Sequence, residues 1–151
     1  MRIHRSERGF SFIEMLVVMI LIGIIASLAI PRLRGSLEKQ NIRSAKALTT
    51  TLVATARGVA VQRGCSATLN LTADSIWVTA CGVNPPAALV QVGTKTLVGS
   101  EFQLTLNPSA ASIVYDPRGI QTQFTATTIR FIGPNYRDSV IINQVGKVVK
   151  Q

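Results

Sequence analysis

Glu14 is an acidic residue near the start of an almost unbroken apolar run, in the stretch RGFSFIEML from Arg8 to Leu16. A carboxylate inside a bilayer costs roughly 2.5–3.5 kcal/mol on insertion scales, so an ionisable residue there is by default a candidate for a functional role. Either Glu14 meets a cationic partner in apolar surroundings, or its side chain merely reaches the lipid headgroups from its place near the end of the run. The first alternative predicts an ion pair in a medium of low dielectric constant.

The side chains on which most enzymes depend are scarce in this chain. His4 is the only histidine, so everything from Arg5 onward lacks imidazole, the commonest general base and metal ligand. Cys65 and Cys81 do not have the spacing of zinc ligands, and no glycine-rich phosphate loop occurs. We therefore expect no catalytic residue, no metal, no cofactor and no small-molecule substrate, and a role other than that of an enzyme.

The balance of charge is strongly basic. Lys and Arg total 16 against 7 acidic residues, which gives a formal net charge of +9. An excess of this size indicates anionic partners, such as nucleic acid, phospholipid headgroups or acidic protein surfaces, and composition alone does not choose among them.

The apolar run Phe10–Ile30 has the length of a membrane span. Its 21 residues would cover about 30 Å as a helix, the thickness of the hydrocarbon core. A cleavable secretory signal ending near Ser27-Leu28-Ala29 is the rival interpretation, but the apolar part of such signals runs to only about 7–15 residues. Arginines and lysines occur on both sides of the run, so the count of positive charges does not fix its orientation.

The stretch RGFSFIEMLVVMILIGIIASLAIP resembles the class III signal of type IV pilins and type II secretion pseudopilins. In that family a short basic leader ends in Gly and is followed by Phe, with Glu at the fifth mature position and Pro at the twenty-second. Gly9, Phe10, Glu14 and Pro31 occupy these positions in register. The resemblance is specific, because it fixes four positions together with the apolar run.

The resemblance implies how the chain is processed and where it lies. A prepilin peptidase would cleave after Gly9, and Phe10 would be N-methylated. The chain would cross a bacterial inner membrane once, with its N-terminus in the cytoplasm and its C-terminal domain in the periplasm. The charged amine of Phe10 on a neighbouring subunit would be the partner of Glu14 in a helical filament. A low dielectric constant strengthens such a pair and penalises an unpaired charge, so Glu14 would set the register of assembly.

A second, amphipathic half of the helix is expected after the membrane. Pro31 cannot donate a helical hydrogen bond, so we expect a kink or a brief break there. A stripe with spacings of three and four residues then predicts an amphipathic helix to about Gln62, with Gly64 as the stop. The stripe consists of Leu37, Asn41, Ala45, Leu48, Leu52, Ala56 and Val59.

From Cys65 the apolar period changes to two, which predicts strands. SATLNL and DSIWVT flank Thr72-Ala73 and are typical of a hairpin. If Leu71 pairs with Ser75, Cys65 falls opposite Cys81, within reach of a disulfide. The alternative is two buried free thiols. Further strands are expected at Ala88–Val98, Glu101–Leu106, Ser112–Tyr115, Thr127–Ile132, Ser139–Ile142 and Lys147–Val149, with a turn at Asp116–Gly119 and a loop at GVNPPAA.

The expected fold class is therefore α+β, a long N-terminal helix packed on an antiparallel β-sheet. The expected segments are the leader 1–9, the transmembrane helix 10–30, the periplasmic half of the helix 31–64 and a β-rich pilin-like domain 65–151. The order of elements, with ATARGVAVQRG, YDPRG and a basic C-terminal VGKVVK, also resembles the GspH/FimT branch of the family.

Two functions follow from the resemblance. In the first, the chain is a minor pseudopilin or minor pilin of a type II secretion or type IV pilus filament, with other minor subunits as partners and the filament tip as one possible position. In the second, it is a minor pilin that binds double-stranded DNA for uptake. Members with that role carry a C-terminal Gly-Arg-x-Arg, whereas this chain has Gly146 and Lys147 and then Val149 at the fourth position. A basic patch for the DNA backbone would consist of Arg130, Tyr136, Arg137, Lys147 and Lys150, and the alternative is an ordinary solvated surface.

Overall fold

The computed structural model describes residues 10–82 and 88–150. The expected leader, including Gly9, and most of the loop GVNPPAA lie outside the described residues. The chain divides into two compact units, Met1–Leu37 and Glu38–Gln151. We refer to the second as the globular unit.

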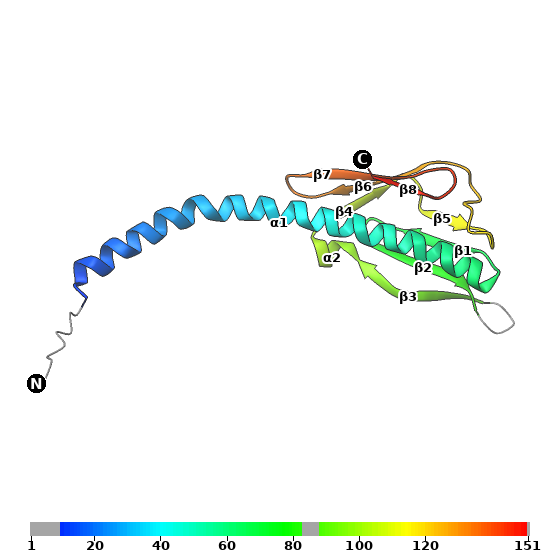
Figure 1. The fold of residues 1–151 in the computed structure, drawn as a ribbon, viewed down its shortest axis with the longest axis horizontal. Helices are drawn as coiled ribbons and strands as arrows, with labels where there is room; N and C mark the ends of the chain where they lie inside the picture. The colour runs from blue at the N-terminus through cyan, green and yellow to red at the C-terminus, as the bar shows by residue number, and fades with distance from the viewer. Residues whose placement is uncertain (1–9, 83–87, 151) are drawn as a thin grey trace, which may run out of the picture. The chain divides into compact units, whose positions relative to one another are not determined.

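Helix α1 (Phe12–Arg63) begins in the first unit and ends in the globular unit (Figure 1). Its limits confirm the expected long helix. It ends where expected, because Gly64 adopts φ +62° and the Cys65 N–H donates to the Ala60 carbonyl at 3.3 Å, as in the usual glycine-terminated helix. α1 stays helical through Pro31, so of the two outcomes expected there only a bend remains as a prediction.

The face of α1 that packs inside the globular unit differs from the expected stripe by about one residue. Leu37 is 51% exposed, and Leu48, Leu52 and Val59 are only half-buried. The buried line consists of Ile42, Ala45, Lys46, Thr49, Val53, Ala56 and Ala60. Small residues dominate this line because they let the helix backbone approach the sheets closely, while the larger apolar side chains cover its flanks. A pattern of large apolar residues therefore predicts the buried face of α1 about one residue out of place.

The strands form two four-stranded antiparallel sheets, where a single sheet was expected. The first has the order β3-β2-β1-β5, with β1 at Ala67–Leu71, β2 at Ser75–Cys81, β3 at Leu89–Leu97 and β5 at Ser112–Tyr115. The second has the order β4-β6-β7-β8, with β4 at Thr105–Pro108, β6 at Thr127–Ile132, β7 at Arg137–Ile142 and β8 at Val148–Lys150. Side chains of α1 and of both sheets form one apolar core, so the expected α+β class is confirmed.

The predicted strand Glu101–Leu106 is wrong in its first half. The chain instead forms a short helix, α2 (Val98–Phe102), and Gln103 has a left-handed φ of 54° before β4 begins. Leu104 is buried and Phe102 is half-buried, but they lie on the turn that carries the chain from the edge of the first sheet to the second. Periodicity alone cannot separate these two arrangements.

The β1–β2 hairpin and the disulfide are present, with a register one residue away from the expected one. Leu71 pairs with Ile76, and the loop is Ala73-Asp74. Thr72 sets this register, because its N–H donates to the Ser75 carbonyl at 3.0 Å and its hydroxyl accepts from the Ser75 N–H at 3.1 Å. Cys65 lies before β1 and bonds to Cys81 at a Cα–Cα distance of 6.3 Å.

Replacing both cysteines by serine should lower the free energy of unfolding by about 3 kcal/mol, the chain-entropy value for a closed loop of this length. The reason is that the bond between Cys65 and Cys81 closes a loop with a sequence separation of 16. Denaturant unfolding of the full chain in detergent micelles, with and without reductant, would measure the change. Equal stability of the oxidised, reduced and doubly substituted proteins would contradict it.

Candidate functional site

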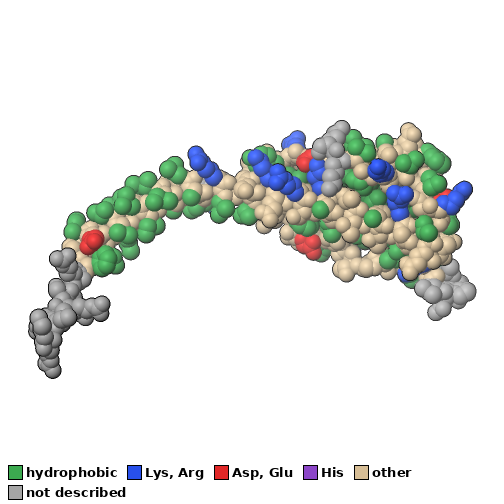
Figure 2. All heavy atoms as spheres, in the orientation of Figure 1, with side chains coloured by type: hydrophobic (Ala, Val, Ile, Leu, Met, Phe, Trp, Pro, Cys, Tyr) green, Lys and Arg blue, Asp and Glu red, His purple; other side chains and the backbone are tan. Residues whose placement is uncertain are grey.

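From Phe12 to Ile30, α1 presents almost only apolar side chains, and nearly all of them are exposed. Phe12, Met19 and Leu28 are 83%, 76% and 68% exposed, and no apolar residue from Phe12 to Ile30 is buried. Figure 2 shows hydrophobic side chains along the visible face of this part of the helix. By length and composition, α1 is the one helix among the described residues that could cross a membrane. A helix that is apolar all round and unburied by protein suits a hydrocarbon environment.

Glu14 lies in the first turn of this apolar segment and is exposed. It makes no hydrogen bond or ion pair with residues 10–82 or 88–150. Phe10 precedes it by four residues, lies just before the start of α1 and is 74% exposed. The chain therefore presents an unpaired carboxylate close to the residue that the leader motif predicts as the mature N-terminus.

The second sheet has an inner face buried against the core and an outer face open to solvent. Ile129, Phe131, Val140 and Ile142 are fully buried, whereas their neighbours Arg130 and Arg137 are exposed. Arg130 pairs with Ser139, and Arg137 pairs with Ile132. The two arginines are thus diagonal neighbours on the outer face. They line a shallow hollow of about 450 Å³ together with Asn107, Ile132, Asp138 and Ser139.

The other residues of the predicted basic patch do not join this hollow. Lys147 belongs to the turn after β7, where its N–H donates to Asn143 Oδ1 at 2.7 Å. Arg137 is the first residue of β7, at the other end of the strand, and lies roughly 20 Å from Lys147 at the usual rise per residue. Lys150 pairs with Val140 in β8. The Tyr136 ring instead contacts Lys39 of α1. The structure therefore brings Arg130 and Arg137 together and separates Lys147 from them.

Glu38, at the start of the globular unit, holds the loop between β6 and β7. Its Oε1 accepts from the backbone N–H of Asn135 at 2.8 Å and of Tyr136 at 2.9 Å, and its Oε2 accepts from Asn135 Nδ2 at 3.0 Å. Partial desolvation raises the pKa of Glu38, but these hydrogen bonds outweigh it and leave the pKa below its ordinary value. Lys39 adds a contact with the loop, since its Nζ lies 4.5 Å from the centre of the Tyr136 ring.

Lys46 anchors the beginning of β7. It is only 8% exposed, and its Nζ donates to Asp138 Oδ2 at 2.7 Å. The other carboxylate oxygen of Asp138 accepts from the Ser139 N–H at 2.7 Å. Glu38 and Lys46, two turns apart on α1, therefore fix the residues on both sides of Arg137.

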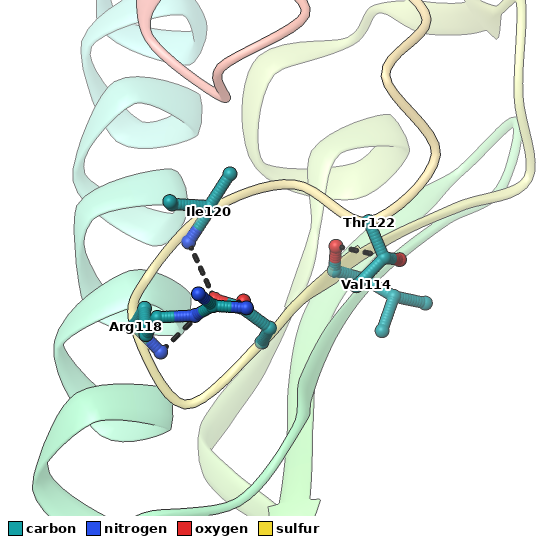
Figure 3. A network of polar contacts seen from close by, with 5 residues as sticks. Val114, Arg118, Ile120 and Thr122 are labelled. Carbon is teal, nitrogen blue, oxygen red and sulfur yellow. Dashed lines mark hydrogen bonds and ion pairs between the residues drawn. The ribbon is translucent and has the colours of Figure 1, made fainter.

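The opposite end of the globular unit is closed by the loop after β5 (Figure 3). Asp116 Oδ1 accepts from the N–H groups of Arg118 and Ile120, each at 2.9 Å, and the Gly119 N–H donates to the Asp116 carbonyl at 2.8 Å. This confirms the expected turn. The hydrogen bond from Ile120 is the main reason why the pKa of Asp116 lies below its ordinary value. Arg57 Nε donates to the Gly119 carbonyl at 3.0 Å, which ties the loop to α1.

Two protein-family models match this chain. Residues 4–30 match the prokaryotic N-terminal methylation motif, and residues 45–146 match type II transport protein GspH. The chain belongs to the GspH family. These matches confirm the resemblance to the GspH/FimT branch.

Similar curated proteins match over less than a third of this chain. The chain is 42% identical over 45 residues to type II secretion system core protein G of Escherichia coli K12, covering 30% of this chain and 31% of that protein. It is 40% identical over 42 residues to the core protein G of Dickeya chrysanthemi, covering 28% of each chain. The matched segment thus spans about a third of these relatives or less.

Solved structures support the fold over most of the chain. The type IV minor pilin FimU of Pseudomonas aeruginosa PAO1 matches with a TM-score of 0.59 and 14% identity, over 76% of this chain and 90% of that one. A second crystal form of FimU gives a TM-score of 0.55 and 15% identity, over 72% and 91% of the two chains. The long helix packed on antiparallel sheets is therefore shared with a minor pilin.

Sequence reasoning missed the residues of this GspH-family protein that hold the β6–β7 loop. The stripe expected from the sequence does not include Lys46, yet its spacing of four from Ile42 puts it on the buried line. That spacing was a signal that could have been used. Glu38 and Asp138 carried no comparable signal, because their partners are far away in the sequence. Among the described residues, no group of three or more His, Cys, Asp or Glu could hold a metal ion.

Lys46→Ala should lower the free energy of unfolding by about 1–3 kcal/mol, because it removes a charge-assisted hydrogen bond from a largely buried position. Arg43→Ala, an exposed change one turn earlier on α1, should stay within about 0.5 kcal/mol of the wild type. Denaturant unfolding of the full chain in micelles would test both. Equal effects would mean that the contact with Asp138 does not contribute.

Glu38→Gln should lower the melting temperature more at pH 7 than at pH 3. A carboxyl group whose pKa is depressed by folding stabilises the protein above its ordinary pKa of 4.5, and this contribution is lost as the pH falls through the folded-state value. Thermal unfolding followed by circular dichroism at the two pH values would measure it. Glu101→Gln is the matched control, since Glu101 is exposed and makes no hydrogen bond within the described residues. A deficit for Glu38→Gln that does not change with pH would contradict the role of the charge.

Proposed function

We propose that this chain is a minor pseudopilin of a type II secretion filament, assembled through the first part of α1. The observation that carries the proposal is the unburied apolar segment whose Glu14 has no partner among residues 10–82 and 88–150, in a chain of the GspH family. The family description and the core protein G relatives favour secretion over a type IV pilus, although the fold is shared with the minor pilin FimU.

Assembly begins with processing in the inner membrane. A prepilin peptidase removes the leader after Gly9, and Phe10 becomes an N-methylated N-terminus that carries a positive charge. The apolar segment then anchors the protein with its N-terminus in the cytoplasm and its globular unit in the periplasm. The match of residues 4–30 to the methylation motif supports this sequence of events.

Glu14 acts after the subunit leaves the lipid for the filament. Its carboxylate pairs with the amine of Phe10 on a neighbouring subunit, while the surrounding apolar side chains pack against adjacent helices. Leaving either charge unpaired in apolar surroundings is costly, so only one axial register satisfies both. The pair therefore selects a register of packing as well as contributing to its stability. The chain catalyses no reaction in this role.

Uptake of DNA is the less favoured function. The basic patch that it requires is divided, because Lys147 lies at the other end of β7 from Arg137. The two arginines of a Gly-Arg-x-Arg segment are replaced here by Lys147 and Val149. A lysine presents a single point charge to phosphate and lacks the planar pair of donors of an arginine.

Glu14→Gln should leave the protein in the membrane but reduce its recovery in filaments sheared from cells at least about tenfold, because losing one partner of a buried pair costs roughly 3–5 kcal/mol. Immunoblots of membrane and filament fractions would measure both amounts. Ser11→Ala is the control, an exposed change in the same segment that keeps the carboxylate. Normal recovery of Glu14→Gln in filaments would contradict the proposed pairing.

A further inference from the structure

The outer face of the second sheet has two positive charges in otherwise neutral surroundings. Strand pairing places nine residues on this face: Thr105, Asn107, Thr128, Arg130, Ile132, Arg137, Ser139, Ile141 and Val149. Only the two arginines are charged, and they stand on either side of the hollow described above. Val149 is 45% exposed, and Ile132 and Ile141 are half-buried. Arginine among neutral polar and apolar side chains is a composition typical of protein interfaces.

The two guanidinium groups are unpaired. Neither Arg130 nor Arg137 makes an ion pair or a side-chain hydrogen bond within residues 10–82 and 88–150. Asp138 is the one acid that lines the hollow, and its two oxygens are taken by Lys46 and by the Ser139 N–H. The hollow therefore lacks an anion that the chain itself could supply from these strands.

The position of Arg137 is fixed before any ligand arrives. The residue before it, Tyr136, donates its N–H to Glu38, and the residue after it, Asp138, is held by Lys46. Both anchors lie on α1. A backbone held on each side loses little further freedom on binding, which favours affinity.

A carboxylate is the anion that suits this place. Its two oxygens match the planar fork of a guanidinium group, and the Asn107 amide and Ser139 hydroxyl add neutral donors at the rim. A DNA duplex needs a continuous basic track along its phosphates, whereas the other seven positions on this face are neutral, and the pair beyond Ser139, Ile141 and Val149, is apolar. These neighbours favour a protein ligand.

We propose that this hollow receives an Asp or Glu side chain from a neighbouring subunit of the filament, with the apolar outer-face residues packing around it. This rests on the proposed function only for the identity of the partner. The contact is separate from the pairing at Glu14, because it lies on the globular unit. It would give the subunit a second point of recognition that depends on the sequence of its neighbour.

The test is a titration that requires no filament. The full chain in detergent micelles is added to a short labelled peptide of alternating Glu and Ala, to its Gln-for-Glu counterpart and to a short labelled DNA duplex, with fluorescence anisotropy as the readout. We expect the Glu peptide to bind at least about tenfold more tightly than the Gln peptide and than the duplex, a factor within the range of one charge-assisted bidentate contact.

Arg130→Lys/Arg137→Lys keeps the net charge and removes both forks, so it should weaken binding of the Glu peptide about tenfold. Arg43→Lys/Arg118→Lys, the matched double change at exposed positions elsewhere, should leave binding within about twofold. Equal losses in the two variants, equal binding of the two peptides, or preference for the duplex would each overturn the proposal. Such a result would not affect the proposed pairing of Glu14. Normal incorporation of Glu14→Gln into filaments, in turn, would not affect the proposed binding of an acidic side chain in the hollow.

Discussion

One uninterrupted helix has to satisfy two different media. In the first unit α1 has no apolar side chain shielded by protein, and in the globular unit it buries a narrow line of small residues against two sheets. A helix satisfies its own backbone hydrogen bonds, so it can pass from lipid to protein without any change of backbone structure. Only the side chains have to change. Glu14 is the only charged residue from Phe10 to Ile30, and the proposed assembly depends on it.

The globular unit depends on how closely α1 approaches the sheets. Ala45, Ala56 and Ala60 are fully buried, and residues on the same helix reach across to loops at both ends of the sheets. Arg57 binds the loop after β5, while Glu38 and Lys46 bind the segment between β6 and β7. The helix thus fixes the conformation of surface loops as well as the core. The contacts of Glu38 and Lys46 hold the residues on both sides of Arg137, which lines the hollow.

The parts that could be predicted from the sequence are those set by local patterns. The limits of α1, the stop at Gly64, the turn at Asp116–Gly119 and most of the strands follow from periodicity and from turn residues. The predicted hairpin is one residue out of register. The predicted bond between Cys65 and Cys81 is nevertheless correct, because Cys65 lies outside the strand ladder.

The remaining features depend on contacts between distant segments. The division into two sheets arises at α2 and Gln103, where the alternation of apolar residues is the same for a strand and for a turn with buried side chains. The ion pair of Lys46 joins residues 92 positions apart, and the loop held by Glu38 is 97 positions away. The grouping of Arg130 with Arg137, without Lys147, follows from strand pairing that a linear pattern of charges does not contain.

The mass of the mature N-terminus shows directly whether the amine that Glu14 is proposed to bind exists. The chain, purified from bacterial membranes, should begin at Phe10 with one methyl group on its amine. Peptide mass spectrometry after digestion would read this end. A start at Ile30 would mean that the apolar segment is an ordinary signal sequence, and the retained leader would mean that no prepilin peptidase acts on the chain. Either result would remove the amine that Glu14 is proposed to bind.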